Sequence, residues 1–441
     1  MAGKREENQI CWFSAEPQSV TECHDCGLHQ RLPDLDYGDV FCVRCGRRLR
    51  RIVQGTLTKS LALAVTGLIM LALALWEPFI TVEVAGRQHR ADLLSGIWTF
   101  AEQGFLELAV FVTVNTILAP ALSWVLIAAV VVLLATKRPP RALVPMTLWI
   151  ERLAPWAMVE VYLLALFVSY TKLADLAKVE FGNAVYALAG MMLVTVLLSA
   201  RLDHHAFWEA MERKGVTHRP PGSDVGRSYS CHGCGLLLRL WARASERLHC
   251  PRCGSGLHRR KPQSLTRAWS LLITAAVLYI PANAYPVMTV VSLGKSYPST
   301  ILGGVTDLIL LGSWPLALII FIASIAVPFL KISALMVLLI TTHRGTAWRL
   351  RDRTRLYRLV EVVGRWSMID IYVVSLMIAL VQIGQLATFY PGFGATCFAA
   401  VVVLTMLAAM SFDPRLMWDR AGENAAPAAQ PAKPSGDRVP A

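Results

Sequence analysis

The chain has 441 residues, of which 55% are hydrophobic and only 17% are charged, and its mean hydropathy is +0.48. This composition excludes an ordinary soluble domain, because it offers too much apolar surface and too little charge, and it predicts a polytopic membrane protein. The net charge of +13 is compatible with nucleic acid, but the basic residues gather beside apolar segments, where membrane orientation explains them more simply. We therefore expect no nucleic-acid partner.

A polar N-terminal tail, residues 1–19, is followed by two CxxC pairs that define a first ribbon, residues 20–52. The pairs comprise Cys23, Cys26, Cys42 and Cys45, and fifteen residues separate them. Four thiolates at this spacing can close a tetrahedron, which leaves no open position on the metal and favours a structural site over a redox site. Zinc is the expected metal, and iron is the alternative because similar knuckles bind iron in rubredoxins.

The next segment, residues 53–205, is predicted to be a first transmembrane domain with four spans. The predicted spans are 61–80, 107–135, 156–170 and 184–200. Each is a long apolar run able to cross a hydrocarbon core of about 30 Å. Residues 93–104 form a shorter run between glycines and are expected to be interfacial or re-entrant. A polar linker, residues 206–227, ends this half.

The second half repeats the first. Cys231, Cys234, Cys250 and Cys253 each lie 208 positions after a cysteine of the first ribbon and define a second ribbon, residues 228–262. A second transmembrane domain, residues 263–415, contains predicted spans at 269–291, 314–340, 366–389 and 395–410. The remainder, 416–441, is rich in alanine and proline and is expected to be disordered. The predicted fold is all-α, with two tandem four-helix transmembrane domains, each preceded by a small zinc ribbon.

Two offsets relate the halves. Pro120 corresponds to Pro328 at 208 positions, whereas Glu160 corresponds to Asp370 at 210. Since each half has an even number of spans, the repeat is expected to be parallel. Reduced metal-binding thiols and the basic loops both indicate the cytoplasm, so we expect both ribbons and both termini on that side.

Ionisable residues inside the predicted spans mark a candidate site, because a charge at the bilayer centre costs about 2.5–3.5 kcal/mol. Lys331 and Asp370 enter from the same face and reach depths of about 15 Å and about 16 Å at 1.5 Å per residue, so they are expected to meet. Ser324 and Ser367 share their helix faces, and Thr405 reaches a similar depth.

This charged pair has two interpretations. It is either a structural clasp that fixes helix register or a working site whose state changes on ligand or proton binding. We favour the working site, because apolar packing would have sufficed for stability. The first half differs, since Ser123 stands where Lys331 does and the repeat therefore offers Glu160 no matching lysine.

These features resemble the paraquat-inducible protein A family of Gram-negative inner membranes. The resemblance covers about residues 20–420 and rests on the tandem CxxCGL and CxxCG knuckles and four further motifs. These motifs are Asn283-Ala-Tyr-Pro286, Pro328-Phe-Leu-Lys331, Trp366-Ser-Met-Ile-Asp370 and Phe412-Asp-Pro-Arg-Leu-Met-Trp-Asp419. It implies an integral membrane partner of a periplasmic mammalian-cell-entry (MCE) tunnel protein, with phospholipids or other lipophiles as cargo. It also implies a polar network at Ser324, Lys331, Ser367, Asp370 and Thr405.

We therefore predict a lipid transport subunit and no enzyme, since HExxH, GxSxG and complete phosphate-loop motifs are missing from the sequence. Two alternatives stay open. One is a membrane regulator that senses metal or redox state through its ribbons. The other is a proton-coupled exporter of small amphiphiles. The direction of transport, the energy source and the lipid are not encoded in any motif.

Overall fold

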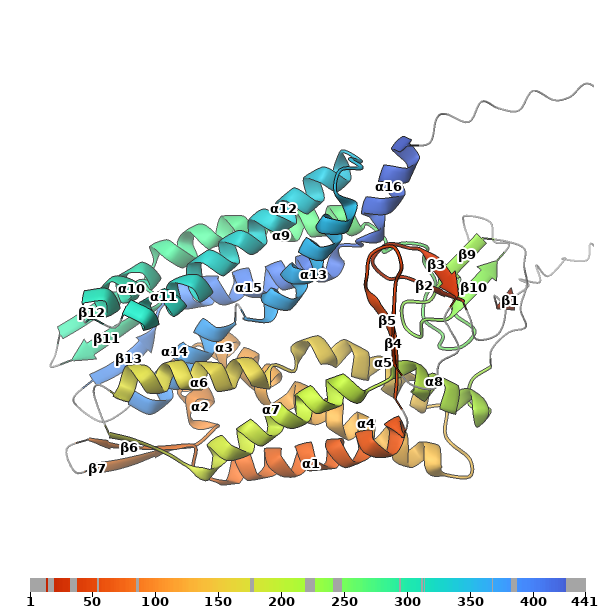
Figure 1. Ribbon diagram of the computed structural model, residues 1–441. Helices are drawn as coiled ribbons and strands as arrows, with labels where there is room; N and C mark the ends of the chain where they lie inside the picture. Colours follow the sequence, from red (N-terminus) through yellow and green to blue (C-terminus); the bar gives the residue numbers. More distant parts are fainter. Residues whose placement is uncertain are drawn as a thin grey trace, which may run out of the picture.

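A computed structural model describes most of the chain. The described residues are 13–14, 20–31, 38–53, 55–84, 87–174, 178–218, 227–240, 248–292, 295–310, 312, 314–366, 368–381 and 387–425. The two halves lie side by side, with both ribbons at one end of the molecule and a small sheet from each half at the opposite end (Figure 1). The halves therefore run in the same direction, as the even number of predicted spans indicates.

The elements of the first half follow a simple order. Its ribbon contains β2 (Val20–Glu22), β3 (His29–Arg31), β4 (Gly38–Phe41) and β5 (Arg48–Ile52). Its membrane part contains α1 (Thr56–Trp76), β6 (Ile80–Val84), β7 (Arg87–Ala91), α2 (Ser95–Glu102), α3 (Leu106–Thr113), η1 (Val114–Leu118), α4 (Ala119–Ala135), α5 (Leu143–Leu153), η2 (Ala154–Trp156), α6 (Val159–Ala174), β8 (Lys178–Phe181), α7 (Asn183–Arg201) and α8 (His204–Arg213).

The second half repeats that order. Its ribbon contains β9 (Arg227–Ser230) and β10 (Leu237–Leu240), and β10 also pairs with β1 (Phe13–Ser14). Its membrane part contains α9 (Ser264–Ala284), β11 (Met288–Ser292), β12 (Lys295–Ser299), α10 (Ile301–Leu310), α11 (Trp314–Phe321), η3 (Ile322–Ala326), α12 (Val327–His343), α13 (Leu350–Trp366), α14 (Ile369–Val381), β13 (Ala387–Pro391), α15 (Phe393–Ser411) and α16 (Arg415–Ala425).

Seven helices in the described part of the chain are long and apolar enough to cross a membrane. They are Thr56–Trp76, Leu106–Ala135, Leu143–Tyr170, Asn183–Arg201, Ser264–Ala284, Ala317–His343 and Phe393–Ser411. The predicted eighth span, 366–389, contains α14, but residues 382–386 lie outside the described residues. Since many apolar side chains of these helices are exposed, hydrocarbon is the environment that suits their outer faces.

One turn of π-helix interrupts the same helix in each half. η1 precedes Pro120 and η3 precedes Pro328, and the two turns are 208 residues apart. Proline has no N–H, so the backbone close to it cannot keep a regular hydrogen-bond ladder. A single π turn absorbs this irregularity, and such turns occur frequently at functional sites.

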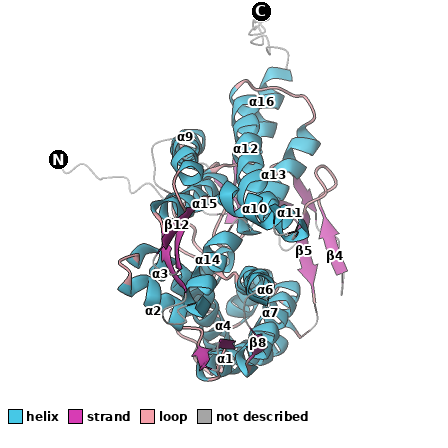
Figure 2. Cartoon of the chain, turned by 90° about the vertical axis from the view of Figure 1, so that its left-hand side faces the viewer, coloured by secondary structure: helices cyan, strands magenta, loops and turns pink. Residues whose placement is uncertain are grey.

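Equivalent helices of the two halves meet at the centre of the molecule. α6 packs against α14, and Figure 2 shows α14 between the two groups of helices. The rings of Tyr162 and Tyr372, which are 210 residues apart, make an edge-to-face contact with centroids 5.4 Å apart. Contact between equivalent residues places an approximate two-fold axis at this position.

Each ribbon packs against the membrane part of the opposite half, an arrangement called here the ribbon crossing. The cysteines of the first ribbon share a buried cluster with second-half residues such as Leu272 and Trp418. The cysteines of the second ribbon are buried with first-half residues such as Trp208. Equivalent arginines make equivalent contacts, since Arg44 stacks on Trp418 at 4.1 Å and Arg252 stacks on Trp208 at 5.2 Å.

The sheets at the far end differ from the sequence prediction. β6 pairs with β7 and β8, and β11 pairs with β12 and β13, all antiparallel. The predicted spans 61–80 and 269–291 therefore extend too far, because α1 ends at Trp76 and α9 at Ala284. A short apolar strand that follows an apolar helix continues the same hydrophobic run, so periodicity does not separate them.

A glycine allows a close backbone approach in each sheet. Gly392 donates its N–H to the carbonyl of Val287 at 2.8 Å. A Cβ at Gly392 would lie 2.1 Å from the carbonyl oxygen of Pro286, and one at Gly182 would lie 2.0 Å from that of Pro78. Backbone atoms cannot move aside as a flexible side chain does, so both positions require glycine.

Gly392→Ala is expected to destabilise the protein by about 1–3 kcal/mol, because overpacking against a fixed backbone costs that much. Thermal unfolding of the purified protein in lipid nanodiscs measures the loss. The matched control is Gly422→Ala in α16, where an added Cβ meets no neighbour within 4 Å. Equal melting temperatures for Gly392→Ala and the unchanged protein would contradict this account of the sheet.

Candidate functional site

Each ribbon brings its four cysteine sulfurs into one buried cluster. All four sulfurs of a cluster lie within 4.8 Å of one another. The Cys23–Cys45 and Cys231–Cys253 sulfur pairs are 3.5 Å and 3.4 Å apart. A tetrahedral ion with metal–sulfur bonds of about 2.3 Å requires separations slightly larger than these. Both predicted cysteine sets can therefore hold a metal ion.

The knuckle geometry explains why the cysteines converge. In the first ribbon the N–H of Gly27 bonds the carbonyl of Cys23 at 2.8 Å, and in the second the N–H of Gly235 bonds that of Cys231 at 2.9 Å. These glycines have φ values of 70° and 68°, a left-handed conformation that glycine adopts without strain. The turn folds the chain back so that both cysteines of each CxxC pair face inward.

A cavity of about 370 Å³ lies between the ribbons and the first half. Basic and imidazole side chains dominate its lining, including Arg47, Arg50, His24 and His205. Burial, followed by the charge of Arg50 and Arg252, lowers the pKa of His205 to about 4, so this imidazole is neutral at pH 7. The arginines are suited to balance the net negative charge that four thiolates carry around a divalent ion.

Three of the five predicted polar residues of the second half are buried between the helices. Lys331 of α12 is 3% exposed, and its Nζ has no hydrogen-bond partner among the described residues. Ser324 in η3 is 1% exposed, and its hydroxyl is likewise without a partner in that part of the chain. Thr405 of α15 is 2% exposed and donates to the carbonyl of Val402 at 3.0 Å.

The other two predicted members lie outside what the structure describes. Ser367 is outside the described residues, and Asp370 belongs to α14 but its side chain is not described. The expected meeting of Lys331 with Asp370 therefore stays a prediction. In the first half, Ser123 is buried where Lys331 stands in the second.

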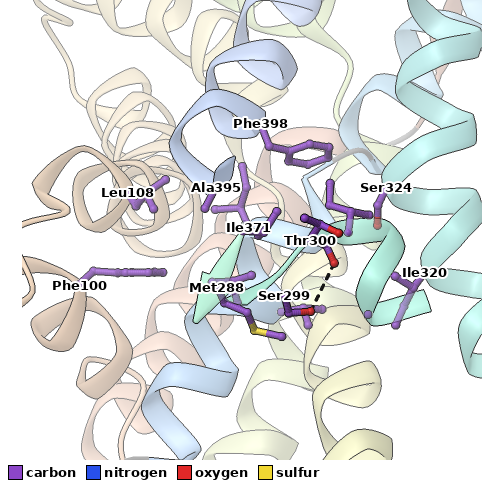
Figure 3. Close-up of a pocket in the computed structure, with 15 residues that line it drawn as sticks. Phe100, Leu108, Met288, Ser299, Thr300, Ile320, Ser324, Ile371, Ala395 and Phe398 are labelled. Atoms are coloured by element: carbon purple, nitrogen blue, oxygen red, sulfur yellow. Dashed lines mark hydrogen bonds between the residues drawn. The ribbon is translucent and has the colours of Figure 1, made fainter. Parts of the chain in front are cut away.

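Close to Ser324, a small apolar cavity of about 70 Å³ lies towards the sheet end of the second half. Ser324 and Ile320 line one side, and Phe100 and Leu108 of the first half reach it from the other (Figure 3). Ser299 adds a hydroxyl to the lining, so the cavity is mostly apolar with a few polar groups. This combination suits a hydrocarbon chain near its polar end.

The sequence alone did not identify Phe100 or Leu108 as neighbours of this cavity. Phe100 belongs to α2, which lies in the run expected to be interfacial, yet its ring is fully buried. α2 packs on α14 of the opposite half. A pattern within one segment carries no signal for such a contact, so only the assembled fold reveals it.

The repeated helices, the paired four-cysteine clusters and the buried polar residues define a two-fold repeated, polytopic membrane protein with two ribbons that can each hold a metal ion. The family model of paraquat-inducible protein A matches residues 57–212 and 265–422, which are the two membrane repeats. The chain belongs to this family.

Curated relatives match over nearly the whole chain. The Intermembrane transport protein PqiA of Escherichia coli (strain K12) is 34% identical over 408 residues, covering 91% of this chain and 96% of the relative. The Lipophilic envelope-spanning tunnel protein A of the same strain is 31% identical over 398 residues, covering 90% of both. A Probable intermembrane transport protein of Haemophilus influenzae is 28% identical and covers 92% of this chain and 97% of its own length. No solved structure matches the chain significantly.

The purified protein is expected to contain two equivalents of metal per chain, one for each four-cysteine cluster. Cys250→Ser should lower this to one, because a structural site loses most of its affinity for the metal when one of its four thiolates is removed. Inductively coupled plasma mass spectrometry measures the content and identifies the metal. Cys397→Ser, which alters a buried cysteine outside both clusters, serves as the control. A metal content that stays at two equivalents in Cys250→Ser would disprove the metal site in the second ribbon.

Proposed function

We propose that this chain is the inner-membrane subunit of a lipid transport system. Two relatives carry the names intermembrane transport protein and envelope-spanning tunnel protein, which supports a lipophilic cargo that crosses between membranes. The observation that carries the proposal is Lys331, an ionisable side chain that is 3% exposed on an apolar helix. A charge there costs about 2.5–3.5 kcal/mol on insertion scales, so a functional role explains its presence better than packing does.

The transport site comprises the polar residues of the second half. Lys331, Ser324 and Thr405, together with Ser367 and Asp370, form the network that accepts a headgroup or a proton. The apolar cavity next to Ser324 takes the start of an acyl chain. Its volume of about 70 Å³ is far too small for a whole lipid, so loading requires the helices around it to separate.

The molecule is oriented with both ribbons and both termini in the cytoplasm. Reduced thiolates with metal-ligand spacing and the basic residues of the ribbon-side loops support this orientation. Zinc is the metal, since tetrahedral sets of four cysteines are its usual structural site. The two small sheets then face the periplasm, where a tunnel protein with MCE domains receives or delivers lipid.

Lys331→Ala is expected to abolish complementation of a strain that lacks the gene, because the network loses its cation. Immunoblotting of membrane fractions checks that the variant inserts normally. The matched control is Ser123→Ala, which changes the equivalent position of the first half and should retain activity. Full activity from Lys331→Ala at normal protein levels would exclude the proposed site.

Ala395→Leu is expected to reduce copurified lipid by roughly fivefold or more, because filling a packed cavity costs about 1–3 kcal/mol. Ala395 lines the cavity. Lipid extraction followed by mass spectrometry measures the bound amount and identifies the lipid. Ala400→Leu makes the same change at a half-buried position of the same helix that is not part of the cavity lining. Equal lipid in the two variants would remove the cavity from the transport path.

A further inference from the structure

The first ribbon makes an ionic contact with the second half. At the equivalent position, the second ribbon makes an apolar contact with the first half instead. Asp25, 1% exposed, accepts from the Nε of Arg358 in α13 at 2.6 Å and also pairs with Arg47. The other end of the Arg358 guanidinium donates to the carbonyl and to the sulfur of Cys45, both at 3.1 Å. One side chain of the second half therefore binds both a buried carboxylate and a metal-ligand sulfur of the first ribbon.

The equivalent contact on the other side is apolar. Asp25 corresponds to Gly233 and Arg358 corresponds to Leu148, at offsets of 208 and 210. A Cβ at Gly233 would lie 2.8 Å from a methyl carbon of Leu148, so these two residues also touch. The two crossings share one geometry, but at this position only the first uses charge.

The same helix reaches Lys331 at its other end. Gly364 lies six residues after Arg358 in α13, about 9 Å along the axis. A Cβ at Gly364 would lie 2.9 Å from the Nζ of Lys331, so the amino group lies directly against the α13 backbone. The first half has Ala154 in place of Gly364 and Ser123 in place of Lys331.

Three differences between the halves thus occur together along one path. The ionic ribbon contact, the glycine on the same helix α13 and the buried lysine on α12 are all present in the second half and all replaced in the first. If the ionic contact served only to attach a ribbon, either half could carry it. Arg358 lies on α13, the helix that contacts Lys331, so the ionic contact is connected through this helix with the polar site.

We propose that Asp25 and Arg358 position α13 against Lys331, so that the first ribbon controls the packing of the polar site in the opposite half. Arg358 is a positioning residue, since it acts through α13 and contacts no cargo. The inference rests on the proposed role of Lys331. A divalent ion with four thiolates carries net negative charge. Metal binding in the first ribbon would therefore strengthen the electrostatic attraction between the cluster and the Arg358 guanidinium.

Arg358→Gln in the full-length protein in nanodiscs tests the proposal by hydrogen–deuterium exchange. Residues 359–366 of α13 and the segment around Lys331 should exchange about tenfold faster or more, because hydrogen bonds to charged groups contribute about 1.5–3 kcal/mol. Arg355→Gln is the matched control on the same helix, since Arg355 is 67% exposed and pairs only at the surface with Asp352. Leu148→Ala, at the apolar crossing, should leave these segments unchanged.

Complementation with the same variants supplies the second measurement. Arg358→Gln should lose activity with both metal equivalents retained, and Arg358→Lys, which keeps the charge beside Asp25, should restore most of it. Unchanged exchange and activity in Arg358→Gln would overturn the positioning role while leaving the transport site intact. A different result would reject the proposed site itself. In that case Lys331→Ala would retain activity while Arg358→Gln still made α13 exchange faster. The proposed control of the site by the first ribbon would then be rejected as well.

Discussion

The burial of one lysine side chain on an apolar helix is the constraint on which the rest of this structure depends. Lys331 is 3% exposed, and a charge in hydrocarbon is stable only if the surrounding helices supply polar contacts or water. Among the described residues its Nζ has no hydrogen-bond partner, and the backbone near it is irregular. A π turn precedes Pro328 on the same helix, and a glycine on α13 lets the backbone approach the amino group of Lys331.

Duplication gave this molecule two copies of one architecture, and the copies have diverged in their polar chemistry. The helices, the π turns and the small sheets recur at fixed offsets, and Tyr162 meets Tyr372 at the approximate two-fold axis. The first half keeps these features but has Ser123 in place of the lysine. The first half also supplies Phe100 and Leu108 to the cavity of the second. The first half therefore forms one side of the cavity in the second half.

Much of this organisation is readable from the amino-acid sequence, because it depends on local spacing. The cysteine pairs predict both four-cysteine clusters, and long apolar runs predict the helices. The burial of Ser324, Lys331 and Thr405 agrees with their positions inside those runs. The outer sheets were missed, since the strands at Ile80–Val84 and Met288–Ser292 continue the apolar character of the preceding helices. The cavity wall and the ribbon crossing join residues hundreds of positions apart, and no local pattern encodes such contacts.

The crossing of the ribbons has a consequence for biosynthesis. Asp25 and Arg358 are 333 residues apart, so the first ribbon leaves the ribosome long before its docking helix is made. At about 5–20 residues per second, the wait is on the order of tens of seconds. During that interval the newly made ribbon is without the surface of the second half on which it docks. Helices translated later thus complete the environment of the first ribbon, and a nascent chain that stops before α13 leaves that ribbon undocked.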